Sequence, residues 1–495
     1  MTFLKKYYPL LLILVLASVL RVHLLLVRGT FWFDEIFSVH FSSLPWKEAL
    51  RYWLIETNPP FYTFFLRFWL KIAPVSNELL VHLPSLIAGL ASIALLYYFA
   101  QKFFSKRAAI ASALFFALSD ITIFLNTEAR GYSFLIFFAI LSFFLYFEIF
   151  FNNKKTRGWW ITYFLTNALL LSTHLTALSV PFGQALCLIL LKPDKTDLKK
   201  WWSGHTIIGL FWLYWFVPSI IAKIDPSSTT AWFFSSDTEA NSGNIAILLI
   251  SLFFTSFHKL PFIIFAAAIL AWLVFQYARN FKDLNFEQKK QRMVLAVWAF
   301  LLPITGAMAG VLTVKFYVLS APALYLIAGE GLTAGTAKYA KNFWLALAAA
   351  GLFLLPSAML TSTEATFSWR IFTNYIEQNE TPESLIIITP FNEELSLNHY
   401  YHGQTPIAGL YLRDDNFTLD ERIVRYNWNR QVTDKRKLEE WVEKKIAGRK
   451  KIFYIQYTEE YDWVHQILKK HGWKLYQKGK PSRFINICLF EFREN

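Results

Sequence analysis

The sequence predicts an α-helical membrane protein that crosses the bilayer many times and ends in a soluble α/β domain. Of its 495 residues, 55% are hydrophobic and only 17% are charged, whereas about a quarter of the residues of a soluble protein are charged. Long apolar runs follow one another as far as about residue 361. Beyond that point the composition becomes charged and the apolar runs become short. These observations define the two parts of the predicted fold.

About eleven apolar runs approach the roughly 20 residues that a membrane-spanning helix needs. We place them at 8–27, 79–101, 107–125, 132–151, 158–173, 175–192, 203–222, 260–278, 293–312, 316–333 and 342–361. The first run resembles the core of a signal peptide, but no clear small-residue cleavage pattern follows it, so we expect an uncleaved helix. The segment 245–257 is apolar but short, and its sequence leaves open whether it spans the membrane, re-enters it or lies at the interface.

The basic residues predict the orientation of these helices. They gather in alternate loops, at Lys5, Lys6, Lys102, Lys106, Arg107, Lys154, Lys155, Arg157, Lys192, Lys195, Lys199, Lys200, Arg279, Lys282, Lys289, Lys290, Arg292, Lys338 and Lys341. By the positive-inside rule these loops and the N-terminus face the cytoplasm. Because the number of spans is odd, the loop after the first helix and the C-terminal region then lie outside. Topology therefore explains the net charge of +14, and we expect no nucleic-acid partner.

The C-terminal region alternates short β-like runs with amphipathic helical patterns, which predicts a small α/β domain. The expected strands are Ser384–Thr389, Lys451–Gln456 and Phe484–Phe492. The apolar faces of the two expected helices are Leu438, Trp441, Val442 and Ile446, and Tyr461, Val464, Ile467 and Leu468. Cys187 and Cys488 fall in different regions, so we expect no disulfide.

These patterns divide the chain into a membrane domain, residues 1–361, and an α/β domain, residues 362–495. The membrane domain contains a long external loop at 29–78. The α/β domain has enough residues to hold a core of its own.

Two adjacent carboxylates, Asp34 and Glu35, follow the first apolar run in Phe31-Trp32-Phe33-Asp34-Glu35. Charge at a membrane boundary suggests a functional site. Asp34 could act as a general base while Glu35 orients an acceptor, or the pair could bind a metal. The alternative is a hydrated acid pair at the interface, although the flanking aromatic residues favour a function at headgroup depth.

Other candidate residues lie at the predicted outer ends of spans. Glu56 and Asn58 belong to Glu56-Thr57-Asn58-Pro59-Pro60-Phe61-Tyr62, whose prolines predict a rigid turn. Arg130, in Glu128-Ala129-Arg130-Gly131-Tyr132, could hold a phosphate through its planar guanidinium or simply anchor the helix at the interface.

Three further motifs also have a simple structural alternative. Lys315, in Lys315-Phe316-Tyr317, opposes the positive-inside trend but could be an ordinary boundary residue. His174, in Ser172-Thr173-His174, occupies a short external turn and could be structural. Arg21 and His23 could face the same cavity, but we expect them to snorkel to the interface.

Several nucleotide-binding motifs are missing from the sequence. It has no Walker loop, no strand-linked Gly-x-Gly-x-x-Gly and no Asp-x-Asp motif. A sugar donor is therefore more consistent with a lipid-linked sugar than with a nucleotide sugar.

The order of these motifs resembles the pattern of one known family. The motifs are an external Asp-Glu, Asn-Pro-Pro-Phe-Tyr, Glu-Ala-Arg-Gly-Tyr, Ser-Thr-His and a late basic–aromatic motif. It is similar to the bacterial members of the protein O-mannosyltransferase and aminoarabinose-transferase group of GT-C glycosyltransferases, over roughly residues 1–360. Two positions depart from the family pattern. One residue separates Lys315 from Tyr317, and Asn58 stands where many relatives have His before Pro-Pro.

The resemblance implies a GT-C fold and an inverting transfer of a sugar from a polyprenyl-phosphate donor at the outer face of the bacterial plasma (inner) membrane. It implies that Asp34 is the base, assisted by Glu35, and that the donor phosphate is bound by Arg130, Lys315, Tyr132 and Tyr317. Glu56, Asn58 and His174 would line the acceptor side of the cavity. Some relatives bind a divalent metal, for which Asp34, Glu35, Glu56 and His174 are the candidate ligands.

The acceptor class remains open between lipid A, protein and glycan, and membrane lipids are the remaining expected partners. The alternative is a transporter or lipid-linked sugar flippase without covalent chemistry. Transporters tend to carry inverted repeats and charges near the midplane, whereas these candidate residues collect on one predicted face. The pattern therefore favours the enzyme.

Overall fold

The structure, a computed structural model, describes residues 2–222, 244–253, 260–308, 313–337, 340–364, 368–413, 416–425, 434–456, 463–479 and 488–494. Its backbone forms two compact units. The membrane unit comprises residues 1–24, 58–217 and 233–361, and the sheet unit comprises residues 25–57, 218–232 and 362–495.

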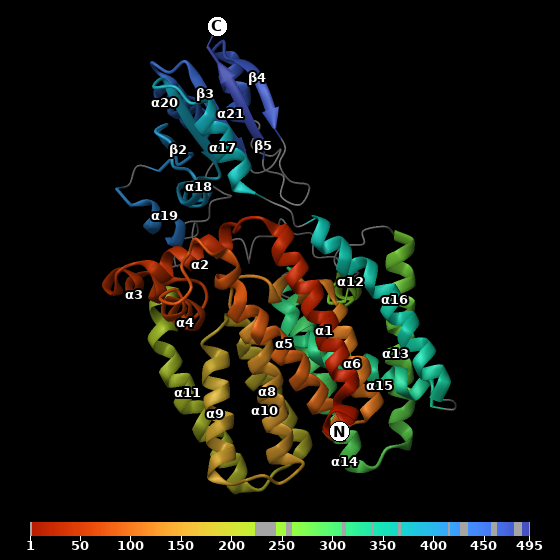
Figure 1. The fold of residues 1–495 in the computed structure, drawn as a ribbon. Helices are drawn as coiled ribbons and strands as arrows, with labels where there is room; N and C mark the ends of the chain where they lie inside the picture. The colour runs from red at the N-terminus through yellow and green to blue at the C-terminus, as the bar shows by residue number, and fades with distance from the viewer. Residues whose placement is uncertain are drawn as a thin grey trace. The chain divides into compact units, whose positions relative to one another are not determined.

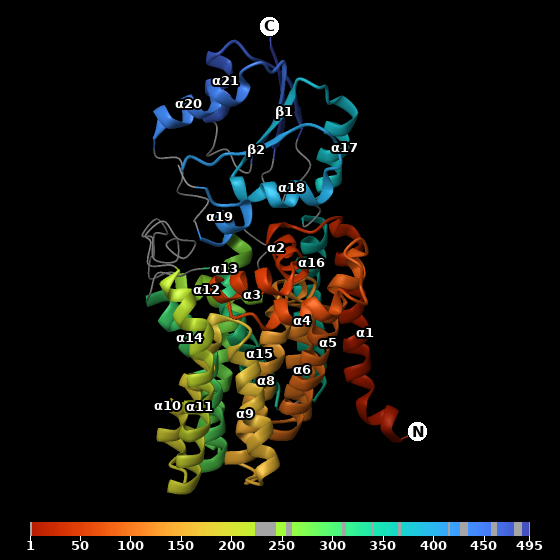
Figure 2. The ribbon, with the colours of Figure 1, turned by 90° about the vertical axis from the view of Figure 1, so that its left-hand side faces the viewer.

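The membrane unit is a bundle of helices that run up and down beside one another (Figures 1 and 2). Three of its helices, α1, α11 and α16, continue into the sheet unit. The helices of the unit are α1 (Thr2–Arg28), α4 (Phe61–Trp69), α5 (Glu78–Phe103), α6 (Lys106–Leu118), α7 (Asp120–Asn126), α8 (Tyr132–Phe150), α9 (Arg157–Leu171), α10 (Ser179–Leu191), α11 (Lys195–Ile221), α12 (Asn244–Ser251), α13 (Leu260–Asn280), α14 (Phe286–Met308), α15 (Ala321–Gly335) and α16 (Ala340–Glu364). Three 3₁₀ segments connect them, namely η1 (Leu175–Leu178), η3 (Phe281–Asp283) and η4 (Val314–Ser320).

Within the described residues, eight helices are long and apolar enough to cross a membrane, or nine if the bent pair α6 and α7 is one span. Each predicted span overlaps a helix, and those expected at 158–173 and 175–192 correspond to the shorter helices α9 and α10. The segment at 245–257 contains α12, of 8 residues, and is described only as far as residue 253. The predicted fold class, a multi-pass helical membrane protein with a C-terminal α/β region, is confirmed.

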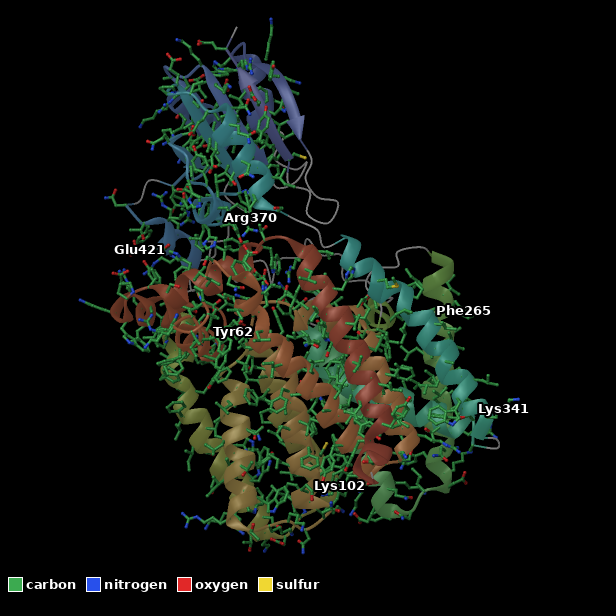
Figure 3. The ribbon with its side chains drawn as sticks, viewed as in Figure 1. Tyr62, Lys102, Phe265, Lys341, Arg370 and Glu421 are labelled. Carbon is green, nitrogen blue, oxygen red and sulfur yellow. The ribbon has the colours of Figure 1, made fainter. Side chains whose placement is uncertain are left out.

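Burial differs strongly between the helices of the bundle. In α8 and in the span Val314–Gly335, 78% and 94% of the residues of the most apolar stretch are buried, so these helices form the centre of the unit. Outer helices such as α11 instead expose large apolar side chains, as lipid-facing surfaces do. Lys102 and Lys341 lie at the end of the unit opposite Tyr62 (Figure 3).

Helix α6 breaks at Ser119, and α7 continues at an angle of 66°. Side chains bind the backbone around this break: the Arg21 guanidinium donates to the Ala117 carbonyl oxygen at 3.1 Å, and Thr122 Oγ1 donates to the Phe116 carbonyl oxygen at 2.7 Å. Arg21 is fully buried and also donates to Asn126 Oδ1. The expectation that Arg21 snorkels is therefore wrong, because its charge satisfies polar groups inside the bundle.

The sheet unit contains a five-stranded sheet in the order β2-β1-β3-β5-β4. Strands β1, β2 and β3 run parallel, and β5 is antiparallel to β3 and β4. The strands are β1 (Ser384–Thr389), β2 (Ile407–Gly409), β3 (Lys451–Gln456), β4 (Lys474–Gly479) and β5 (Cys488–Arg493). The helices are α2 (Phe33–Ser43), α3 (Trp46–Ile55), α17 (Trp369–Asn379), α18 (Glu394–Tyr400), α19 (Leu419–Arg425), α20 (Lys435–Ile446) and α21 (Trp463–Lys470), with the 3₁₀ turn η5 (Phe391–Glu393).

Helices cover both faces of this sheet, with α17 on one side and α20 and α21 on the other (Figure 2). The predicted strands Ser384–Thr389 and Lys451–Gln456 are confirmed, and the third overlaps β5, although residues 484–487 lie outside the described residues. The apolar face predicted for α20 packs on the sheet, as does the described part of the α21 face; Tyr461 lies outside the described residues. Cys187 and Cys488 are free, as expected.

The region expected as an external loop at 29–78 is largely helical and holds α2, α3 and α4. Residues 25–57 pack with residues 362–495, so the sheet unit begins well before the domain boundary expected at residue 361. The acid pair of the sequence motif therefore belongs to the same compact unit as the C-terminal sheet.

Candidate active site

The segment before the acid pair is held by helices of the C-terminal region. Three hydrogen bonds make this connection: Arg370 Nη1 to the Gly29 carbonyl oxygen at 2.9 Å, Trp369 N to Thr30 Oγ1 at 3.1 Å, and Phe31 N to Tyr400 Oη at 2.9 Å. Two polar contacts hold the helices that follow, a hydrogen bond between His40 and Asp420 at 3.0 Å and an ion pair between Arg51 and Glu421 at 2.6 Å. The position of the acid pair within the sheet unit thus depends on residues far along the chain.

Glu35 is buried and paired. Its Oε1 lies 3.4 Å from Arg28 Nη1, and its Oε2 accepts a hydrogen bond from Trp32 N at 3.2 Å. The second contact caps the first turn of α2, where a carboxylate also interacts favourably with the helix dipole. Because both oxygens are engaged, the geometry suits Glu35 to holding the turn in place.

Asp34 is half-buried and faces a different environment from Glu35. Its charge acts on Glu393, a buried residue at the end of η5. The pKa of the Glu393 carboxyl is raised to about 8, mainly by burial and also by the negative charge of Asp34, while the Ser396 hydroxyl opposes the rise. At neutral pH Glu393 is therefore largely protonated.

Sequence reasoning missed Glu393. The residue follows β1 by a few positions, at the carboxyl end of a strand that pairs with two parallel neighbours. Open α/β sheets bind ligands at this edge, so an acid directly after the first predicted strand was a usable signal.

Four predicted motifs converge inside the membrane unit. These are the turn before α4, the Arg130 turn, the His174 turn and η4. The start of α4 contacts two of them: Phe61 N donates to the Ser172 carbonyl oxygen at 2.9 Å, and Tyr62 packs so closely on Gly131 that a Cβ added there would lie 3.2 Å from Tyr62 Cβ. The His174 ring contacts the other two, with its centroid 5.5 Å from that of Tyr132 and 5.7 Å from that of Phe316. Residues more than 250 positions apart in the sequence are thus brought together at the ends of four helical segments.

His174 stands at the centre of this group. Burial, together with the positive charges of Arg130 and Lys315, lowers its pKa to about 3. Both cations are half-buried and lie close enough to act on the imidazole. We call Arg130, His174 and Lys315 the cation corner.

The other predicted residues have distinct surroundings. Tyr132 and Tyr317 are buried, and Tyr317 packs against Gly306 in α14, where any side chain would overlap its ring. Asn58 is half-buried in the turn before α4 and belongs to the membrane unit. Glu56 belongs to the sheet unit, where its backbone oxygen accepts a hydrogen bond from Ser219 Oγ at 2.8 Å.

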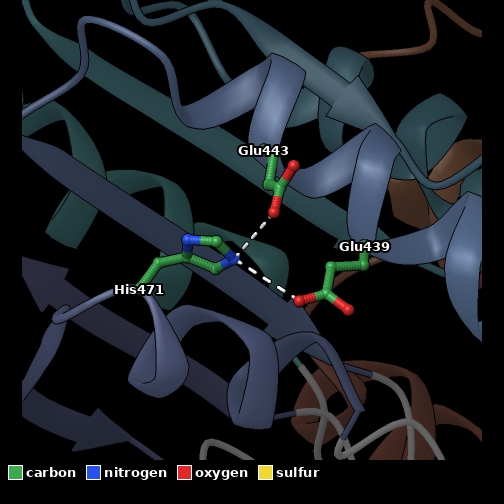
Figure 4. A group of neighbouring side chains, drawn as sticks. All are labelled: Glu439, Glu443 and His471. Atoms are coloured by element: carbon green, nitrogen blue, oxygen red, sulfur yellow. Dashed lines mark ion pairs between the residues drawn. The ribbon is translucent and has the colours of Figure 1, made fainter.

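Within the described ranges, one group of three side chains has the spacing of a metal site, namely Glu439, Glu443 and His471 (Figure 4). His471 Nε2 lies 3.7 Å from Glu439 Oε1 and 3.1 Å from Glu443 Oε1, and Glu439 is also paired with Lys470. These residues lie on α20 and at the C-terminal end of α21, and none was predicted as a ligand. Their exposure and the competing lysine are typical of surface ion pairs.

A cavity of about 370 Å³ lies within the membrane unit, between α13, α15 and α16. Its lining is almost wholly apolar and includes Phe265 and Trp272 of α13 and Phe353 of α16. Such a cavity accommodates hydrocarbon but offers no group to bind a phosphate.

Comparison with known proteins found a matching family model and solved structures of similar fold. Residues 57–221 match the family model of dolichyl-phosphate-mannose-protein mannosyltransferases. No curated protein matches the chain. The matched stretch contains the Asn58, Arg130 and His174 motifs.

The fold is similar to two solved membrane enzymes. ArnT from Cupriavidus metallidurans shares 14% identity over 97% of each chain, with TM-scores of 0.61 in its apo state and 0.56 bound to undecaprenyl phosphate. Archaeal oligosaccharyltransferase AglB from Archaeoglobus fulgidus, in complex with an inhibitory peptide and a dolichol-phosphate, shares 12% identity over 97% of this chain and 74% of its own, with a TM-score of 0.55. The GT-C fold and the family resemblance predicted from the motifs are confirmed.

Proposed function

We propose that this chain, which has the GT-C fold and resembles the protein O-mannosyltransferase and aminoarabinose-transferase group, is an inverting glycosyltransferase that uses a polyprenyl-phosphate-linked sugar. The observation that carries the proposal is the cation corner, where four motifs of the family pattern meet around one buried histidine. The solved ArnT bound to undecaprenyl phosphate supports the choice of donor class.

The cation corner supplies the chemistry that the donor needs. When the sugar leaves a polyprenyl phosphate, negative charge grows on the phosphate oxygens, and fixed cations stabilise that charge. Arg130 binds such a group through paired N–H donors, and Lys315 adds a point charge. Tyr132 and Tyr317 pack around these groups and help to fix their positions.

Asp34 is the proposed general base. An inverting transfer needs one carboxylate to take the proton from the acceptor hydroxyl or amine as it attacks the sugar. Asp34 is half-buried and acts electrostatically on Glu393. Glu35, paired with Arg28, holds Asp34 in position.

The reaction is proposed to take place at the outer face of the bacterial plasma membrane. Lys102 and Lys341 lie at the end of the membrane unit opposite Tyr62 (Figure 3), and basic loop residues favour the cytoplasmic side. The Asn58 and Arg130 motifs then face outward, and the odd number of predicted spans favours the same side for the C-terminal region. The acceptor is a lipid such as lipid A, a protein or a glycan that reaches this face, with Glu56 and Asn58 as candidate contacts.

A flippase for lipid-linked sugars is the second candidate, and the broken helix α6–α7 favours it. Transporters often use broken helices with buried charge to bind substrates, and Arg21 is fully buried beside this break. Arg21, however, satisfies backbone and amide oxygens there, as a structural residue does.

Cells that lack the protein, complemented with the wild type or with Asp34→Asn, test the function. If the chain is a transferase, mass spectrometry of envelope lipids, proteins and glycans will show an acceptor that loses the mass of one sugar, while the lipid-linked sugar accumulates. Only the wild type will restore the product. A flippase would instead be restored by both variants, because translocation does not need a base.

A further inference from the structure

The imidazole of His174 has one nitrogen in use and one without a partner. Its Nδ1 accepts a hydrogen bond from the backbone nitrogen of Thr176 at 3.2 Å and lies 2.9 Å from Thr176 Oγ1. Its Nε2 is buried and has no hydrogen-bond partner among the described residues. The residue as a whole is only 7% exposed. An unsatisfied polar atom at this depth calls for a ligand.

The occupied nitrogen determines where the proton lies. A backbone N–H can only donate, so Nδ1 must accept and cannot carry a proton. The same contact shows that the ring is neutral, because a protonated imidazole carries a proton on both nitrogens. A neutral imidazole with a bare Nδ1 has its proton on Nε2. The unpartnered atom is therefore a hydrogen-bond donor.

A donor beside two cations selects an anion. The rings of Tyr132 and Phe316, which follow Arg130 and Lys315 closely in sequence, lie against the His174 ring on centroid distances of 5.5 and 5.7 Å. A metal ion does not suit this environment, because Nε2 would have to lose its proton and two positive charges would repel the ion. His174, one of the candidate metal ligands of the sequence, is therefore not suited to that role in this arrangement.

We propose that His174 donates its Nε2–H to a phosphate oxygen of the polyprenyl donor, as the neutral third member of a phosphate site with Arg130 and Lys315. The inference rests on the proposed function, because it names a contact within the same donor site. It moves His174 from the acceptor side of the cavity to the donor phosphate. The neutral imidazole contributes a directional hydrogen bond to the phosphate, and the two cations contribute electrostatic attraction.

Lipid binding to the purified full-length protein in detergent tests this contact. The probes form two pairs whose members differ only in the phosphate. The first pair is undecaprenyl phosphate and undecaprenol, and the second is phosphatidic acid and diacylglycerol. His174→Phe keeps a flat ring for packing but removes the donor, whereas His174→Gln removes the ring but keeps an N–H of similar reach. His205→Phe is the matched control, since this half-buried histidine also has an unpartnered Nε2 but stacks on Trp201 in α11.

The wild type should prefer undecaprenyl phosphate to undecaprenol. His174→Phe should reduce that preference by about tenfold or more, the scale of a lost hydrogen bond to a charged group. His174→Gln should keep most of the preference, and His205→Phe all of it. If His174→Phe kept the full preference for undecaprenyl phosphate and His174→Gln lost it, the ring would act by packing rather than by donating a hydrogen bond, and the inference would be overturned.

The same data separate this inference from the proposed function. A wild type that binds undecaprenyl phosphate no better than undecaprenol would overturn the donor site as a whole. A wild type that prefers the phosphate, with an unchanged His174→Phe variant, would overturn the role of His174 alone. An equal preference for phosphatidic acid over diacylglycerol would overturn the assignment to the polyprenyl donor.

Discussion

The backbone nitrogen of Phe31 donates a 2.9 Å hydrogen bond to the hydroxyl oxygen of Tyr400. This bond joins the segment that precedes Asp34 to helix α18 of the C-terminal region, across 369 positions of sequence. The C-terminal region therefore forms part of the support of the proposed base, and its contribution to catalysis can be tested with substitutions that leave the membrane helices unchanged.

Tyr400→Phe should lower turnover more than it lowers the affinity for the donor. The variant leaves the N–H of Phe31 without its acceptor, at a cost of about 1–3 kcal/mol of stability. Asp34 lies three residues later and loses part of its fixed position, and a small misplacement of a catalytic group typically slows a reaction roughly tenfold or more. Measurement of kcat and KM for the donor, together with the melting temperature, checks this expectation.

Tyr401→Phe is the matched control for that experiment. The Tyr401 hydroxyl bonds to Glu380 and accepts from Thr405 N at 2.7 Å, so its loss also weakens the sheet unit. The hydrogen bonds described above join residues 29–31 to Trp369, Arg370 and Tyr400, so turnover should remain near the wild-type value. Equal losses of kcat in both variants would show that stability alone, rather than the Phe31 contact, controls the rate.

Glu393 should make the protein less stable as the pH rises. Its pKa is about 8 in the folded chain, against an ordinary value of 4.5. The folded state thus holds a proton that the unfolded state releases, so stability falls as the pH rises from about 4.5 to about 8. Glu393→Gln mimics the protonated acid and should remove this part of the slope. Melting temperatures of both proteins between pH 5 and pH 8 test it, and parallel curves would contradict it.

Much of the fold could be predicted because its signals are local. Apolar runs locate the membrane helices, and the runs Ser384–Thr389 and Lys451–Gln456 coincide with β1 and β3. Strand β4, Lys474–Gly479, escaped prediction because it is an edge strand with little apolar alternation. Strand β2 has only 3 residues, too few to form a pattern.

The candidate residues could be named from the sequence, but their surroundings could not. Adjacent in sequence, Asp34 and Glu35 differ in burial and partners because α2 turns them in different directions. The contacts to Tyr400 and Glu393 join residues more than 350 positions apart, and no local pattern encodes such pairs. The family resemblance predicted that Arg130 and Lys315 bind one phosphate, but it did not predict that both act on His174.

Arg130→Ala should weaken donor binding. Charge-assisted contacts contribute about 1.5–3 kcal/mol, so affinity for the polyprenyl-phosphate sugar should fall by about tenfold or more. Arg157→Ala serves as the control, because Arg157 is exposed at the start of α9 and far in sequence from the motif. Equal donor affinity in the two variants would show that Arg130 is an interface anchor.

The C-terminus should lie outside the cytoplasm. The basic loops predict a cytoplasmic N-terminus, and an odd number of spans then places residues 362–495 on the other side. A reporter that works only outside, fused after Asn495, should be active, and one that works only in the cytoplasm should be silent. The same reporters fused to the chain cut after Lys154, in a basic loop, should show the reverse pattern. Cytoplasmic activity at both positions would rule out the odd number of spans.

The release of polyprenyl phosphate by purified protein tests the central claim most directly. The assay presents undecaprenyl-phosphate-linked hexoses and pentoses with an envelope extract as the source of acceptor, and measures the freed undecaprenyl phosphate. The wild type should release it with at least one of these donors. Asp34→Asn should release it at a rate lower by about 10²-fold or more, because a general base has been lost. An Asn variant that folds normally and releases undecaprenyl phosphate at the wild-type rate would contradict the claim that Asp34 is the base of a glycosyl transfer.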